Sequence, residues 1–122
     1  MTRILLVLLA SSFVFLAAPV GAADAAAGKA NYDMLCTTCH GPTGKGDGPA
    51  GAALTPPPRD FSVGEFKYDA DKNGTAGEDA DLTLVIKNGA AAYGGNPVMA
   101  PWGHLDDAAL ADLVAFIRTM KE

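Results

Sequence analysis

The chain has 122 residues, a formal net charge of −5, and only two cysteines and two histidines. This length leaves room for one domain and little more. The excess of acidic residues argues against nucleic acid and anionic lipid surfaces as partners, while it permits a protein partner with a basic docking patch.

The first 23 residues have the order of a secretory signal peptide. A positive charge at Arg3 is followed by an apolar run, by the helix breaker Pro19 and then by small residues. The small residues fit cleavage after either Ala22 or Ala23. The alternative is an uncleaved membrane anchor, because the apolar run is at the short limit of the length that spans a bilayer.

We therefore expect a signal peptide over 1–23 and one domain over 24–122. Cleavage would leave the domain in the periplasm and outside the membrane, whereas an uncleaved signal would anchor it there. A domain of this size is near the small end of what folds on core burial alone, so a buried prosthetic group would help it.

The first helix of the domain is expected over residues 25–35. Gly28 and Tyr32 are four residues apart and Cys36 follows at the same interval, so the three lie on one helix face. No segment of the chain alternates convincingly as a strand, and this predicts an all-α fold.

Residues 36–40 read Cys-Thr-Thr-Cys-His and contain both cysteines. A thioredoxin-like disulfide would follow a buried strand, but the segment before Cys36 is alanine-rich and helical. Structural zinc needs four ligands, and no second Cys/His pair joins this one. Haem attachment uses every residue of the motif, since two thiols can bond the vinyl groups while His40 ligates the iron. We therefore predict one haem c, attached through Cys36 and Cys39.

The acidic segment 69–81 precedes the second helix. Asp69, Asp71 and Asn73 stand at the first positions of a calcium loop, but Ala80 occupies the twelfth position, where glutamate is needed. We interpret the segment as an acidic hinge, and calcium binding stays open.

The second helix is expected over residues 79–88, because Leu82, Val85 and Ile86 recur on one side of it. Glu78 or Asp79 suits its start. The pair Asn88-Gly89 suits its end.

The second axial ligand of the iron decides between an electron carrier and a reactive centre. Four residues are candidates: Met34, Met99, Met120 and His104. Met34 lies two residues before Cys36, on the segment that runs along the haem edge, so it cannot reach the far face. His104 stands beside the next helix start and is expected at the surface, with bis-histidine ligation as an alternative.

Met99 lies in an irregular segment that prolines and glycines keep from forming a helix or a central strand. The segment still carries Val98 and Trp102, so it is expected to pack against an apolar surface, and a haem face would serve. Met99 is therefore the predicted sixth ligand; the alternative is a methionine that closes the core. With His40 and Met99 both on the iron, no site remains for oxygen, which favours a carrier over an enzyme.

The third helix is expected over residues 106–120. Its apolar stripe at helical spacing consists of Leu110, Leu113, Val114, Ile117 and Met120. Asp106 and Asp107 lie at its positive N-terminal pole and Arg118 near the other end. Met120 is thus expected in the core and away from the iron.

Three stretches resemble class I c-type cytochromes of the small bacterial mono-haem kind: Gly28-x-x-x-Tyr32-x-x-x-Cys36-x-x-Cys39-His40, Pro97-x-Met99-x-Pro101-Trp102, and ADLVAFIRTM near the end. The resemblance covers essentially all of 24–122. It implies the cytochrome c fold, in which three main helices wrap around one covalently attached haem. The terminal helices of that family cross nearly at right angles, with a small residue at the position of Gly28 and an aromatic at that of Tyr32.

The resemblance also implies roles for three further residues around the haem. Pro49 is the best match to the proline whose carbonyl accepts the Nδ1 hydrogen of the haem histidine. Arg59 would lie near a haem propionate, and the alternative is a solvated loop arginine. Trp102 would line the haem pocket beside Met99.

The function implied is periplasmic one-electron transfer between redox proteins, without chemical conversion of a substrate. The donor would be a protein such as a dehydrogenase or quinol oxidoreductase, the acceptor one such as a terminal oxidase, and the carrier a monomer. Two alternatives remain: a haem subunit bound permanently to a dehydrogenase or oxidase complex, and a five-coordinate haem enzyme or gas sensor.

Overall fold

The computed structural model describes residues 21–122, so nearly all of the predicted signal peptide lies outside the described residues. This part of the chain contains helices and no strand, as predicted. Its elements are α1 (Ala25–Leu35), α2 (Thr37–His40), α3 (Asp79–Asn88), the 3₁₀ helix η1 (Ala90–Tyr93) and α4 (Asp107–Arg118). None of the helices within 21–122 is long and apolar enough to cross a membrane.

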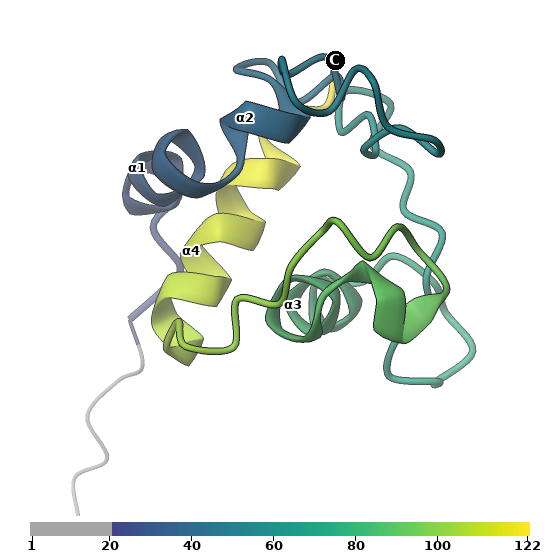
Figure 1. The fold of residues 1–122 in the computed structure, drawn as a ribbon. Coiled ribbons are helices and arrows are strands. Elements are labelled where there is room, and N and C mark those ends of the chain that lie inside the picture. The colour runs from purple at the N-terminus through teal and green to yellow at the C-terminus, as the bar shows by residue number, and fades with distance from the viewer. Residues whose placement is uncertain (1–20) are drawn as a thin grey trace, which may run out of the picture.

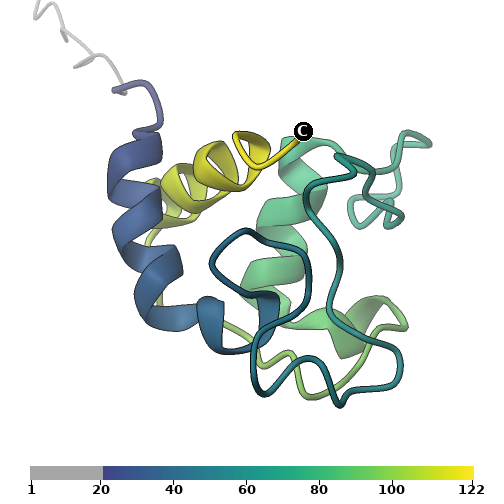
Figure 2. The same cartoon turned by 90° about the horizontal axis from the view of Figure 1, so that it is seen from above.

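The helix α4 lies between α1 and α3, and it crosses α1 (Figures 1 and 2). The crossing is close at Gly28, which is buried against the backbone of Asp112 and Leu113. A Cβ atom on Gly28 would overlap the carbonyl oxygen of Asp112. The start of α1 is tied to the same place, since the backbone N–H of Asp24 donates to Asp112 Oδ1 at 2.6 Å. The expected close crossing at Gly28 is therefore confirmed.

Tyr32 and Leu110 are the most deeply buried residues of the core, and neither is exposed at all. The Tyr32 ring packs edge-on against Phe116, with ring centroids 5.2 Å apart. Its hydroxyl donates to the Gly41 carbonyl at 2.7 Å, which ties α1 to the end of α2. The apolar stripe of α4 supplies much of the rest through Leu113, Val114 and Ile117.

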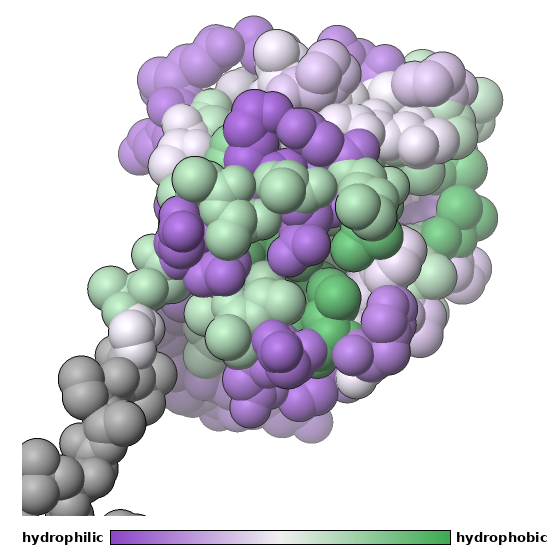
Figure 3. All heavy atoms as spheres, turned by 90° about the vertical axis from the view of Figure 1, so that its left-hand side faces the viewer, coloured by the Kyte–Doolittle hydropathy of each residue, from purple (hydrophilic) through white to green (hydrophobic). Residues whose placement is uncertain are grey.

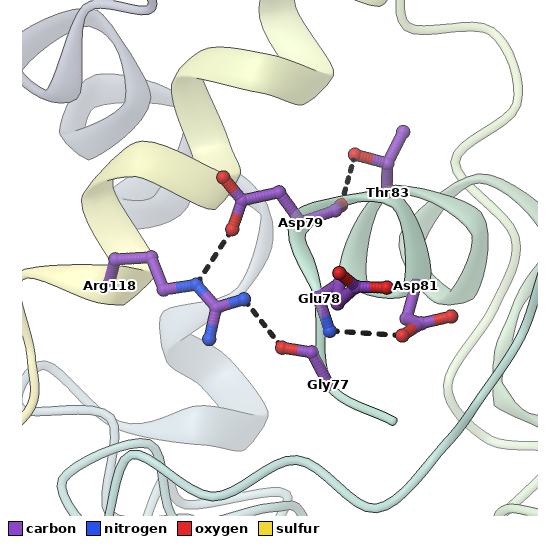
Figure 4. Close-up of polar contacts among 6 residues, drawn as sticks. All are labelled: Gly77, Glu78, Asp79, Asp81, Thr83 and Arg118. Carbon is purple, nitrogen blue, oxygen red and sulfur yellow. Dashed lines mark hydrogen bonds and ion pairs between the residues drawn. The ribbon is translucent and has the colours of Figure 1, made fainter. Parts of the chain in front are cut away.

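The start of α3 is fixed by a capping box and by an arginine from α4 (Figure 4). Glu78 is the N-cap, and its backbone N–H donates to the side chain of Asp81 at 2.9 Å. Arg118 donates to Asp79 Oδ1 at 2.8 Å and to the Gly77 carbonyl at 2.6 Å. These contacts join the C-terminal end of α4 to the N-terminal end of α3.

Two helix ends show how local chemistry sets the boundaries. The helix α3 stops at Gly89, whose φ of 80° lies in the left-handed region that glycine adopts readily. The expected third helix, over 106–120, began one residue too early, because Asp106 is the N-cap of α4. It also ended two residues too late, because Thr119 N–H bonds to the Phe116 carbonyl in a tighter turn that ends α4 at Arg118. Met120 follows the helix and packs against the core, as expected of it.

Candidate functional site

A cavity of about 560 Å³ opens between α3, the end of α1, α2 and the loops on either side of α3. Its wall includes Cys36, Cys39 and His40 on one segment and Met99 and Trp102 on another. From α3 it receives the apolar side chains of Leu82, Val85 and Ile86. This volume is within the range of about 300–1,000 Å³ that is usual for cofactor and small-molecule sites.

The two cysteines are half-buried and do not form a disulfide with each other. Cys36 is the N-cap of the short helix α2, and Cys39 lies within that helix. Burial, with a smaller contribution from Cys39, raises the pKa of the Cys36 thiol to about 11. A redox-active Cys-x-x-Cys pair has the opposite property, a thiol pKa lowered so that the thiolate can attack. The environment of Cys36 therefore disfavours a thioredoxin-like function.

Zinc is also disfavoured at the cysteines. Within residues 21–122, the one group of side chains close enough to share a metal ion is Asp69, Asp71 and Asp81, which contains neither cysteine. Asp69 and Asp81 each accept hydrogen bonds from backbone N–H groups of the same acidic segment. These bonds fold the segment onto the start of α3.

The His40 ring is held from two directions. It stacks on Phe61 with ring centroids 4.5 Å apart, and its Nδ1 lies 3.3 Å from the carbonyl oxygen of Arg59. Because a carbonyl only accepts, Nδ1 carries the hydrogen and Nε2 keeps a free lone pair for a metal. Burial lowers the pKa of His40, although the bond to Arg59 acts in the other direction. The imidazole is therefore neutral near pH 7, the form that ligates iron.

The prediction that Pro49 supplies the carbonyl for His40 is wrong. Pro49 is exposed and outside the cavity wall, because Gly48 and Ala50 donate to the Cys39 and Thr38 carbonyls and fold this loop back onto α2. The Arg59 carbonyl takes the role instead.

The segment that carries Met99 is anchored to the end of α3 by main-chain hydrogen bonds. Met99 accepts from the N–H of Ala90 at 3.3 Å, and Trp102 donates to the Ile86 carbonyl at 3.0 Å. Met99 is half-buried at the cavity, as is Trp102. Met99 therefore borders the same cavity as His40 but comes from a separate part of the chain.

The other candidate ligands lie away from the cavity wall. Met34 is 79 % exposed, and His104 is exposed as expected. The Met120 sulfur lies beside Gly44, and its side chain packs against the hydrophobic core. Among the four candidates, Met99 alone borders the cavity within the described chain.

Basic residues border this cavity on an otherwise acidic chain. Arg59 is exposed, and its Nε donates to the Glu65 carbonyl at 2.7 Å. Lys45 and Lys67 also contribute to the wall, and neither was expected from the sequence. No spacing rule would have indicated them, because they come from loops whose course depends on tertiary contacts. The same wall also contains the carboxylates of Asp60 and Asp81, and Lys45 pairs with Glu122 at 2.8 Å, so Arg59 and Lys67 are the basic residues of the wall best placed for the carboxylates of a ligand.

The donor set fits a c-type haem. Two thiols at positions i and i+3, a neutral imidazole with a free Nε2, and a thioether sulfur all border one largely apolar cavity. The side chains that the sequence predicted as cofactor contacts meet here, with Pro49 as the exception: Cys36, Cys39, His40, Met99, Arg59 and Trp102.

Comparisons with known proteins agree with this chemistry. A protein-family model described as Cytochrome c matches residues 25–121. Among solved structures, the chain is similar to one from the Kuenenia stuttgartiensis reducing HAO-like protein complex Kustc0457/Kustc0458, with 31 % sequence identity and a TM-score of 0.64. That match covers 79 % of this chain and 42 % of the other, so the chain spans less than half the length of this neighbour. No curated protein matches the chain.

Proposed function

Since the chain belongs to the cytochrome c family, a family of haem-based electron-transfer proteins, we propose that it is a periplasmic one-electron carrier. Cys36 and Cys39 attach a single haem c. His40 and Met99 ligate its iron. The observation that carries the proposal is the cavity that both cysteines, His40 and the separate Met99 segment border together.

Different residues of the chain have different roles around the haem. When bound, the haem supplies one-electron oxidation and reduction at its iron. The Arg59 carbonyl and the Phe61 ring fix the orientation of His40 and the nitrogen that it presents. The apolar side chains of α3 exclude water, and low polarity favours the form with less net charge. A thioether from Met99 raises the reduction potential relative to a second nitrogen ligand.

The carrier is expected to meet its redox partners briefly. Contacts of this kind bury less than about 1,200 Å² of surface in total. The carrier is proposed to be a monomer, and on the side of the molecule that carries α1, hydrophilic and hydrophobic residues are interspersed (Figure 3). Donor and acceptor are redox proteins, such as a dehydrogenase or quinol oxidoreductase and a terminal oxidase.

One observation favours a second candidate function, a haem subunit of a larger redox complex. The solved chain described above belongs to a protein complex and is longer than this one. Purification of the native protein under mild conditions separates the two functions. A monomer supports the carrier, and a partner that stays bound in constant ratio through a second column supports the subunit.

The proposed ligands are tested by exposing the purified holoprotein to carbon monoxide and azide at neutral pH. With both axial positions filled, little of either ligand binds quickly. Rapid binding to a high-spin iron would contradict the proposal and favour an enzyme or gas sensor. The intact mass of the protein from the periplasmic fraction tests export, signal cleavage and the number of haems. The expected result is one covalent haem on a chain that starts at Ala23 or Asp24.

A further inference from the structure

The residue Asp81, at the start of α3, is the one charged residue that is buried among residues 21–122. It is 1 % exposed and forms part of the cavity wall, next to Leu82 in the sequence. Nothing in the proposed ligation of the iron uses it. A charged group is costly to bury unless it is compensated, so its place beside a cofactor cavity needs an explanation.

The carboxylate of Asp81 is held by the backbone and by no cation. Its Oδ1 accepts from the N–H groups of Ala70 at 2.6 Å and Asp71 at 3.2 Å, and its Oδ2 accepts from Glu78 N–H at 2.9 Å. The four ion pairs within the described chain leave Asp81 out. The compensation therefore comes from peptide dipoles, which carry partial charges and leave the full negative charge in place.

The charge state of this carboxylate follows from the same contacts. Burial alone would raise the pKa of Asp81, but the backbone hydrogen bonds outweigh burial and hold the pKa below its ordinary value. Asp69 and Asp71, whose carboxylates lie within 4.8 Å of it, add negative charge and no counter-charge. Asp81 is thus a fixed anion at neutral pH, with its position set by the main chain.

A fixed charge acts more strongly through a protein interior than through water, because the effective dielectric constant there is lower. Salt also screens buried charges much less than exposed ones. A haem in the cavity would gain a positive charge at its iron on oxidation, and a nearby buried anion stabilises that form.

We propose that Asp81 is an electrostatic determinant of the reduction potential, whose buried carboxylate beside the cavity stabilises the oxidised haem relative to the reduced one. This inference rests on the haem attachment proposed above. Asp81 is not one of the proposed iron ligands, and at 1 % exposure it is buried from the surface that a partner would meet. It acts through the field at the cavity, so its effect is on the potential.

The test is the midpoint potential of the holoprotein with Asp81→Asn, compared with Asp79→Asn. Asp79 also lies in the first turn of α3, but its side chain is 76 % exposed and pairs with Arg118 at 2.8 Å, so both water and this cation screen its charge. Asp81→Asn is expected to shift the equilibrium between oxidised and reduced haem about tenfold towards the reduced form. This corresponds to a rise of about 59 mV in the midpoint potential for transfer of one electron. Asp79→Asn should change the midpoint potential several-fold less. An Asp81→Asn protein with an unaltered spectrum and an unchanged or lower potential would overturn the proposal.

A second pair of variants separates charge from fold, since Asp81 also caps α3. Glutamate and glutamine both suit this position of a capping box. Asp81→Glu and Asp81→Gln therefore have nearly the same shape and differ in charge. The potential should rise with glutamine and stay near wild type with glutamate, and equal values for the two would overturn the proposal. A wild-type chain that attaches no haem would instead overturn the proposed function.

Discussion

The substitution Gly28→Ala tests the packing on which the haem-binding end of the molecule depends. A Cβ at this position would overlap the Asp112 carbonyl and lie 3.0 Å from the Leu113 nitrogen, and real Cβ atoms essentially never approach other atoms more closely than that. Both obstacles belong to the backbone of α4, so no side-chain rotation relieves them. The helices α1 and α4 must move apart instead.

Two opposing terms set the size of the effect. Alanine is favoured over glycine inside a helix by about 1 kcal/mol. Overpacking that forces side chains and backbone to shift costs typically 1–3 kcal/mol, and a clash with backbone atoms alone lies at the upper end of this range, at about 3 kcal/mol. The clash outweighs the propensity, so we expect a net loss of about 2 kcal/mol in the free energy of unfolding.

The assay is urea denaturation of the haem-loaded protein, followed by far-ultraviolet circular dichroism and by haem absorbance. Ala27→Gly is the matched control, because Ala27 is exposed on the same helix and reports helix propensity without a packing change. It should lose about 1 kcal/mol. A Gly28→Ala protein as stable as wild type would refute the close crossing as the reason for glycine at this position.

Three further outcomes are expected. Tyr32→Phe leaves the buried Gly41 carbonyl without its 2.7 Å donor and should cost about 1–3 kcal/mol in urea denaturation; an unchanged midpoint would contradict this. Arg118→Lys loses a planar donor pair between α4 and α3, including the 2.8 Å contact with Asp79, and should lower Tm by roughly 4–8 °C, as for a loss of about 1 kcal/mol. The folded pKa of Asp81 is lowered, so its stabilisation is complete above the unfolded pKa of about 3.9 and is lost as pH falls through the folded value. The free energy of unfolding should therefore fall less steeply below pH of about 4 in Asp81→Asn than in wild type. Parallel curves for the two proteins would refute a stabilising role of the ionised Asp81 carboxylate.

The sequence predicted α1 and α3 with the observed bounds because their ends are decided locally. Asp24 caps the first, and Gly89 ends the second. The end of α4 was placed too late, since nothing in the apolar stripe indicates that the last turn tightens. The 3₁₀ helix η1 was not predicted, because a run of alanines before Tyr93 carries no distinctive local signal.

The residues of the candidate site differ in the same way in whether the sequence could predict them. The Cys-x-x-Cys-His motif and Met99 could be found from the sequence because residue type and spacing carry their chemistry. The carbonyl partner of His40 could not, since any residue can present a carbonyl and only the course of the chain selects Arg59 over Pro49. The burial of the charged residue Asp81 could not be predicted either, because it depends on how the acidic segment folds onto α3.

The visible spectrum of the oxidised holoprotein, recorded for wild type, Met99→Ala and Met34→Ala, tests the central claim most directly. Met34 is 79 % exposed on α1 and serves as the matched control. The account predicts a thioether-to-iron charge-transfer band in wild type and in Met34→Ala, and its loss in Met99→Ala. A band that survives in Met99→Ala, or a high-spin wild-type spectrum without the band, would contradict Met99 as the ligand opposite His40.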